Sequence, residues 1–284
     1  MTTGDDPGPA PAGPANPGSL EQFIHFPSQW AAPRNLSVWL PPGHEQAGRR
    51  FPVLYMHDGQ NLFDPRASYA GVTWGVAEAM ERLATQGRVR GSLIVGIWNT
   101  PLRRQEYLPQ KPIGASRWAL SRAKALYGGP PLSDGYLRFL VEELKPFVDG
   151  RYQTLPERES TFLMGSSMGG LISAYALCEY PQVFGGVGCL STHWPAGREW
   201  MIAYLRESLP APGAHRIYFD HGTEALDASY ATYQRRVDRV MREAGYTEGK
   251  DWMSRVFGGA EHSERAWRER VHVPLEFLLG APTG

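Results

Sequence analysis

The sequence is poor in cysteine and carries no net charge. Its 284 residues include two cysteines, and 29 Lys and Arg residues balance 29 Asp and Glu residues. Cys178 and Cys189 are too few for a disulfide framework, and their spacing is not that of a zinc site. Balanced charge gives no reason to expect nucleic acid or an anionic membrane as a partner. We therefore expect a small-molecule ligand and neither a metal nor an organic cofactor.

Long apolar runs are also missing. No stretch of 18 apolar residues occurs, so we expect no membrane-spanning segment. The first residues, "MTTGDDPGPAPAGPANPGS", lack the basic and apolar regions of a secretory signal. Their Pro, Gly and Ala content predicts a disordered tail over residues 1–19, followed by one catalytic domain over residues 20–284. The sequence therefore predicts a cytoplasmic protein.

Short apolar runs alternate with segments of helical period after the tail. Seven runs have the length and composition of strands, at residues 35–41, 51–57, 92–98, 160–165, 185–191, 215–222 and 251–259. Helical patterns separate them, among them 133–152, which we expect Ser133 to cap; residues 99–132 look irregular. Strands joined through helices form parallel sheets, so we expect an α/β fold with a mostly parallel central sheet and helices on both faces. No insertion is long enough for a large lid domain.

The stretch "TFLMGSSMGGLISAYAL" contains G-x-S-x-G centred on Ser167. The motif is weak by itself, but here it follows an apolar strand and opens a helix. That context lifts a serine hydroxyl above the edge of a sheet, and the helix N-terminus favours developing negative charge. Gly165 and Gly169 keep the turn free of steric collisions. Ser167 is therefore the predicted nucleophile, whereas Ser166 is expected to pack.

A nucleophilic serine needs a base, which in this architecture follows it in the chain. His262 lies in "FGGAEHSERAW", after the last predicted strand and before the closing helix, and is the predicted base. His193 follows the strand at 185–191 and is a candidate for the pocket wall. His215 and His221 are expected to be strand-end residues, and His272 a structural residue within a helix.

The acid is expected after the strand at 215–222, in "GTEALD". Asp227 and Glu224 both qualify, whereas Asp220 lies inside the strand and is less able to reach the base. Asp227 is favoured because a short carboxylate orients an imidazole better, although it could equally cap the following helix. Glu224 could equally be a solvated loop residue, so the choice stays open.

The oxyanion hole is expected to combine two backbone amides. One is the amide of Met168, directly after the nucleophile, and the other is that of Gln60 in "MHDGQNLFD". His57 and Asp58 in the same loop are expected to shape it. The pocket is expected to draw on His193 and on aromatic residues that follow the predicted strands, namely Trp98, Tyr107, Trp118, Tyr127 and Trp194.

Four stretches in register, "FPVLYMHDGQNLFD", "GSSMGG", "FDHGTEALD" and "EHSERAW", resemble the putative-esterase branch of the α/β-hydrolase superfamily. That branch includes esterase D, feruloyl esterases and enterochelin-type siderophore esterases, and the similarity covers about residues 20–280. The resemblance implies Ser167 as nucleophile, His262 as base, an acid within 224–227, and the amides of Met168 and Gln60 as the oxyanion hole. The branch commonly places its aspartate at the position of Ala225, so the acid here has shifted to Asp227 or Glu224.

These features together predict a serine hydrolase of small or aromatic acyl esters that acts through an acyl-enzyme. Two alternatives keep the same fold and chemistry, a siderophore trilactone esterase and an acyltransferase. A third, from a different class, is a non-catalytic binding module. The sequence predicts neither the natural ester nor the oligomeric state.

Overall fold

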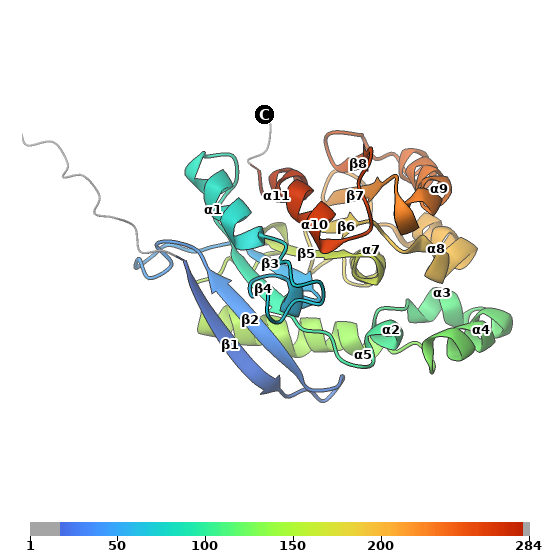
Figure 1. Ribbon diagram of the computed structural model, residues 1–284, viewed down its shortest axis with the longest axis horizontal. Helices are drawn as coiled ribbons and strands as arrows, with labels where there is room; N and C mark the ends of the chain where they lie inside the picture. The colour runs from blue at the N-terminus through green and yellow to red at the C-terminus, as the bar shows by residue number, and fades with distance from the viewer. Residues whose placement is uncertain (1–17, 281–284) are drawn as a thin grey trace, which may run out of the picture.

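The protein, described here by a computed structural model over residues 18–280, is built on an eight-stranded sheet (Figure 1). The strand order is β1-β2-β4-β3-β5-β6-β7-β8; β2 runs antiparallel to both of its neighbours, β1 and β4, and β3 to β8 are parallel to one another. The strands are β1 (Ser19–Phe26), β2 (Arg34–Leu40), β3 (Val53–His57), β4 (Leu93–Ile97), β5 (Thr161–Ser166), β6 (Gly186–Leu190), β7 (Arg216–Gly222) and β8 (Trp252–Phe257). Parallel strands end at one edge of the sheet, and there Ser166 pairs with Leu190 and Leu190 with Asp220.

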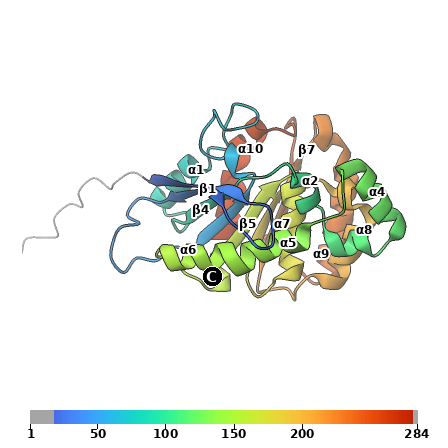
Figure 2. The same ribbon diagram turned by 90° about the horizontal axis from the view of Figure 1, so that it is seen from below.

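Helices cover both faces of the sheet, because neighbouring residues of a buried strand point to opposite sides. Leu54 and Met56 of β3 pack with α1 (Val76–Thr85), α10 (Glu264–Arg270) and α11 (His272–Leu279). Val53 and Tyr55 belong to the core on the other face. That face is covered by α5 (Ser133–Arg138), the π-helical segment η2 (Phe139–Leu144), α6 (Lys145–Arg151), α7 (Met168–Glu179), α8 (Trp194–Ser208) and α9 (Ala231–Glu243). Figure 2 shows α5 and α6 running along this face.

All seven predicted strands are present, each within two residues of its expected bounds. The strand β1 was not predicted. It is an edge strand whose Leu20 and Ile24 are exposed, while Phe23 packs on Phe147 of α6, so its sequence lacks a clear apolar alternation. The predicted tail over residues 1–19 lies outside the described residues up to residue 17, and β1 begins at Ser19.

The segment 99–132, expected to be irregular, contains three short helices instead. These are α2 (Arg103–Glu106), α3 (Gln110–Gly114) and α4 (Arg117–Tyr127). Ser116 caps α4 by accepting a hydrogen bond from the Ala119 amide, a local signal that the prediction missed. The helix at 133–152 is confirmed, but Ser133 is its first residue rather than its cap, and its hydroxyl accepts a hydrogen bond from the Gln110 amide.

The three short helices form an insertion that packs beside α8 rather than a separate lid domain (Figures 1 and 2). The helix α8 follows β6 almost directly and was also not predicted, since Pro195 and Gly197 obscure its start. Within residues 18–280, no helix has the length and apolar character needed to cross a membrane.

Candidate active site

Ser167 occupies a strained turn between β5 and α7. Its backbone angles are φ 57° and ψ −121°, a conformation that costs a non-glycine residue about 1–3 kcal/mol and is characteristic of functional sites. Two backbone hydrogen bonds hold it: the Ser167 amide donates to the Leu190 carbonyl (2.9 Å), and the His193 amide donates to the Ser167 carbonyl (3.0 Å). The turn therefore presents Ser167 at the carboxyl edge of the sheet.

The glycine at 165 is required by the closeness of the helix that follows. A Cβ atom there would lie 2.9 Å from the carbonyl carbon of Gly169, nearer than real Cβ atoms approach backbone. Ser166 is buried at the end of β5, as expected for a packing residue. The small residues of the motif thus have a steric cause that is independent of any chemistry.

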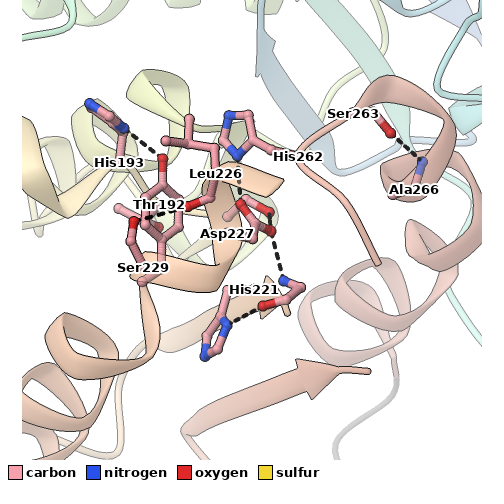
Figure 3. A network of polar contacts seen from close by, with 12 residues as sticks. Thr192, His193, His221, Leu226, Asp227, Ser229, His262, Ser263 and Ala266 are labelled. Atoms are coloured by element: carbon pink, nitrogen blue, oxygen red, sulfur yellow. Dashed lines mark hydrogen bonds and ion pairs between the residues drawn. The ribbon is translucent and has the colours of Figure 1, made fainter. Parts of the chain in front are cut away.

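His262 and Asp227 meet above the sheet edge. The His262 Nδ1 atom lies 2.6 Å from Asp227 Oδ1, and Figure 3 shows the imidazole directed at the carboxylate. Asp227 lies on the short helix η4 (Ala225–Ser229) that follows β7, and it is fully buried. Its Oδ2 atom accepts hydrogen bonds from the Ser191 hydroxyl (2.6 Å) and the Gly222 amide (2.7 Å). Burial raises the pKa of Asp227, but these three hydrogen bonds outweigh burial and place the pKa below its ordinary value.

Glu224, the alternative acid, points elsewhere. Its side chain is exposed, and its carboxylate accepts a hydrogen bond from the neighbouring Thr223 hydroxyl (3.2 Å). The backbone amides of Thr223 and Glu224 both donate to the Ala260 carbonyl (3.1 Å each), which ties the acid loop to the loop of His262. A Cβ atom on Gly222 would lie 2.0 Å from that carbonyl oxygen, so this crossing requires glycine. The geometry thus favours Asp227 as the partner of His262.

A buried polar network lies beneath Asp227. The Ser191 hydroxyl, which donates to Asp227, accepts hydrogen bonds from Arg270 Nη2 (2.8 Å) and Trp267 Nε1 (3.1 Å). Arg270 in turn forms a buried ion pair with Asp220 of β7 (3.1 Å). None of Ser191, Arg270 and Trp267 was singled out from the sequence. Ser191 follows a predicted strand directly, but nothing local distinguishes Arg270 from the surface arginines of its helix.

Aromatic rings hold the His262 imidazole on two sides. The Trp267 ring packs edge-to-face at 5.0 Å and 81°, and the Tyr230 ring at 5.7 Å and 90°. The Tyr230 hydroxyl lies 2.6 Å from Nδ1 of His193. Burial, together with the nearby His262 and Arg103, lowers the pKa of His193 to about 4. His193 therefore does lie at the site, as a neutral imidazole at neutral pH.

The loop after β3 supplies the second candidate amide of the oxyanion hole. Gln60 lies in the short helix η1 (Gly59–Asn61), and Met168 is the first residue of α7, where amides have no carbonyl partner within the helix. Asp58 takes up the left-handed conformation, with φ 56°, and its carboxylate accepts from Arg103 Nε and Nη2 (2.7 and 2.6 Å) and from the Asn99 amide group (2.6 Å).

His57, the last residue of β3, also supports this loop. Its Nδ1 atom lies 2.8 Å from the Tyr136 hydroxyl, and burial lowers its pKa to about 3, with Arg103 and Arg34 adding to the effect and Asp58 opposing it. Both His57 and Asp58 thus have the loop-shaping surroundings expected of them. The Arg103 guanidinium is held in an ion pair with Asp58 (2.6 Å).

Two residues expected in the pocket wall are buried in the core, which corrects that expectation. Tyr107 is 0% exposed beneath the loop of Asp58, whose amide donates to its hydroxyl (3.4 Å). Trp194 is 1% exposed and donates through Nε1 to Gln234 (2.9 Å). Trp98 is half-buried, with its indole N–H bonded to Ser37 of β2 (2.9 Å). An aromatic residue after a strand packs inward when helices cover that side, which the sequence alone does not reveal.

Two cavities lie away from Ser167, His262 and Asp227. One of about 510 Å³ is lined by His215 and Arg216 at the opposite edge of the sheet, and one of about 340 Å³ by Trp30, Leu102 and Glu106. Among residues 18–280, no three His, Cys, Asp or Glu side chains are grouped so as to hold a metal ion.

Comparisons with known proteins identify the family and the fold. A family model described as "Putative esterase" matches residues 29–277. The uncharacterized protein YbbA of Bacillus subtilis is 26% identical over 257 residues, which cover 88% of this chain and 94% of YbbA. The ferri-bacillibactin esterase BesA of Bacillus subtilis is 28% identical over 160 residues, which cover 51% of this chain and 49% of BesA. A solved ferulic acid esterase has the same fold, with a TM-score of 0.67 at 18% identity, covering 93% of this chain and 98% of that one. The chain belongs to the putative esterase family, as a carboxylesterase-type hydrolase with the α/β-hydrolase fold.

Proposed function

We propose that this protein hydrolyses carboxylic esters through a Ser167–His262–Asp227 triad and an acyl-enzyme. The observation that carries the proposal is the 2.6 Å contact between His262 Nδ1 and a fully buried Asp227, beside a serine in a strained strand-to-helix turn. A carboxylate can only accept, so the proton of the neutral imidazole lies on Nδ1 and Nε2 keeps its lone pair. His262 is thereby prepared to act as a general base.

In the proposed reaction, His262 takes the Ser167 proton while the hydroxyl oxygen attacks the ester carbonyl. The amides of Met168 and Gln60 donate to the resulting oxyanion. The imidazolium, stabilised by Asp227, then protonates the leaving alcohol as the bond to it breaks. Water activated by the same His262 cleaves the acyl-enzyme and restores Ser167. Water is the only co-reactant that this sequence of steps needs.

The decisive test is Ser167→Ala, assayed on a chromogenic acetate ester. We expect kcat to fall by about 10⁵-fold, because removing the nucleophile leaves only binding and the oxyanion hole. Ser166→Ala is a matched control, since its side chain is buried in β5, and it should keep most of the activity. Labelling by a fluorophosphonate probe should be lost in Ser167→Ala alone. Substantial turnover by Ser167→Ala would exclude the triad.

A siderophore trilactone esterase is a second candidate, favoured by the charge of the helical insertion. Residues 103–127 carry six Lys or Arg against a single Glu, within a chain of zero net charge. Arg103 pairs with Asp58 and Lys111 with Glu179, but within residues 18–280 no ion pair holds Arg104, Arg117 or Lys124. Such a surface suits a substrate that carries several negative charges. The relative BesA is named for a ferric siderophore.

The two candidates separate in a kinetic panel of small acetates, feruloyl esters and a ferric trilactone. If the enzyme acts mainly on small or aromatic acyl esters, its highest kcat/KM should be with the small acetates and the feruloyl esters. A preference for the trilactone that weakens with added salt would instead support the siderophore esterase. A cytoplasmic location stays a prediction from the sequence.

A further inference from the structure

Tyr230 lies on the same turn as the candidate acid. Its amide donates to the Asp227 carbonyl (2.9 Å), so the two side chains project from one short helical turn. The Tyr230 side chain is fully buried, and its ring packs against the His262 imidazole. A buried tyrosine hydroxyl needs a hydrogen-bond partner, and here that partner is Nδ1 of His193, at 2.6 Å.

His193 is fixed to the nucleophile by its own backbone. The His193 amide donates to the Ser167 carbonyl (3.0 Å), and this hydrogen bond joins the backbone of His193 to that of Ser167. The Ser167 side chain also lies close enough to the Tyr230 hydroxyl to lower the pKa of Tyr230. Ser167 thus has Tyr230 as a polar neighbour besides the predicted base. Neither Tyr230 nor His193 has a part in the proposed triad.

The protonation states decide what this neighbour offers. Burial and the charge of Asp227 raise the pKa of Tyr230, so its hydroxyl keeps its proton. His193 is neutral, as its lowered pKa requires, and therefore carries a single N–H. When that proton lies on Nδ1, His193 donates to the Tyr230 oxygen, and the Tyr230 O–H is free to donate to Ser167 Oγ.

We propose that Tyr230 donates a hydrogen bond to Ser167 Oγ whenever that oxygen carries developing negative charge, and that His193 positions the Tyr230 hydroxyl for it. Negative charge builds on Oγ twice, as His262 removes its proton during attack and as Oγ leaves the carbonyl carbon during deacylation. The proton balance stays that of the triad: His262 takes the Ser167 proton and later returns one, while Tyr230 keeps its own. The inference rests on the proposed function of Ser167.

Tyr230→Phe tests the proposal, because it removes the hydroxyl and keeps the ring that packs on His262. We expect kcat to fall by about 100-fold with little change in KM, as for the loss of one donor to a developing oxyanion. Labelling by a fluorophosphonate should slow by a similar factor, since it also requires attack by Oγ. Tyr246→Phe is the matched control: Tyr246 is 4% exposed, and its hydroxyl donates to the Pro210 carbonyl (2.7 Å), so the variant should keep wild-type kcat and labelling rate.

A pair of His193 variants tests the positioning role even where Tyr230→Phe fails to fold. The side-chain amide of His193→Asn can donate from nearly the place of Nδ1, whereas His193→Ala cannot. We expect His193→Asn to keep kcat within about threefold and His193→Ala to lose about 10-fold, since only the former still holds the Tyr230 hydroxyl.

Wild-type kcat and labelling in a folded Tyr230→Phe would overturn the proposal, as would equal losses in the two His193 variants. Ser167→Ala separates this outcome from a failure of the proposed function. If Ser167→Ala is inactive while Tyr230→Phe is normal, only the role of Tyr230 is wrong. If Ser167→Ala is active, the triad itself is wrong.

Discussion

Two buried carboxylates lie in the loops that follow β3 and β7, and they differ in how close their positively charged partner is. Both carboxylate oxygens of Asp58, in the loop after β3, accept hydrogen bonds from Arg103 or Asn99. Asp227 accepts hydrogen bonds from Ser191 and Gly222, which are neutral, and Arg270 stays 3.9 Å away. The first carboxylate is neutralised in the resting protein, whereas the second still lacks a full counter-charge.

This difference indicates the role of each carboxylate. A neutralised carboxylate can fix the shape of a loop, here the left-handed turn at Asp58 that precedes Gln60. A buried carboxylate without a close cation interacts most strongly with its imidazole partner when that imidazole becomes protonated, as the proposed mechanism requires. Arg270 bonds to Ser191 and Asp220 rather than pairing closely with Asp227. The charge of Asp227 can therefore stabilise a protonated His262.

The largest expected effect comes from replacing Asp227, the carboxylate that contacts His262. Asp227→Asn should lower kcat by about 10³- to 10⁴-fold with the fold intact, because an amide can bind the imidazole in the wrong tautomer. Glu224→Gln is the matched control and should stay within about twofold of wild type, since its side chain is exposed and does not reach His262. Steady-state kinetics on one ester decide the matter, and a larger loss in Glu224→Gln would reverse the assignment.

Replacing Asp58, the carboxylate in the loop after β3, should lower the stability of the fold as well as kcat. Asp58→Asn leaves Arg103 without its counter-charge, and because the Arg103 side chain is 28% exposed, water offsets part of the loss. We expect the free energy of unfolding to fall by about 2 kcal/mol and kcat by about 10-fold, as the Gln60 amide loses its support. Asp64→Asn removes an exposed pair with Arg66 farther along the same loop and should change neither quantity measurably in denaturant titrations and kinetics. Equal stability of the two variants would contradict the comparison.

The stability of the fold should also depend on pH through His57, which precedes Asp58. Its pKa in the folded protein is about 3, below the ordinary value of 6.5, so the unfolded chain binds more protons between these pH values. The contribution of His57 to stability is therefore present above pH 6.5 and is lost as pH falls toward 3, by up to about 1.4 kcal/mol per pH unit. Denaturant titrations from pH 7 to 4 should show a shallower decline in His57→Asn than in wild type. Identical slopes would show that His57 does not titrate in this way.

The smallest effect should follow from loosening the support of Asp227. Ser191→Ala removes one of three hydrogen bonds that lower the pKa of Asp227, so we expect kcat to fall by about 3- to 10-fold. Asp227 stabilises the fold above its unfolded pKa and loses that contribution as pH falls through its lower folded pKa. In Ser191→Ala this loss should occur at higher pH, which the midpoint of acid unfolding measures. Ser173→Ala is the control and should leave both values unchanged, since the buried Ser173 hydroxyl donates to the Gly169 carbonyl of its own helix.

The sequence by itself was enough for the parallel sheet and for the strand-to-helix turn at Ser167. The apolar runs of β3 to β7 are buried on both faces, and the turn at Ser167 depends on glycines within four residues, so both features are encoded locally. The edge strand β1 and the helices α2 to α4 were missed, because their apolar patterns are short or one-sided.

Only the tertiary structure decided which carboxylate meets His262 and which aromatic side chains are buried. Glu224 and Asp227 are three residues apart in one loop, and their different directions depend on the crossing of that loop with Ala260. Tyr107 and Trp194 lie under elements distant in the chain, and Ser191, Arg270 and Asp220 meet only through sheet register and the packing of α10. Pairing and burial of side chains are properties of several segments at once, and a local pattern holds information about only one of them.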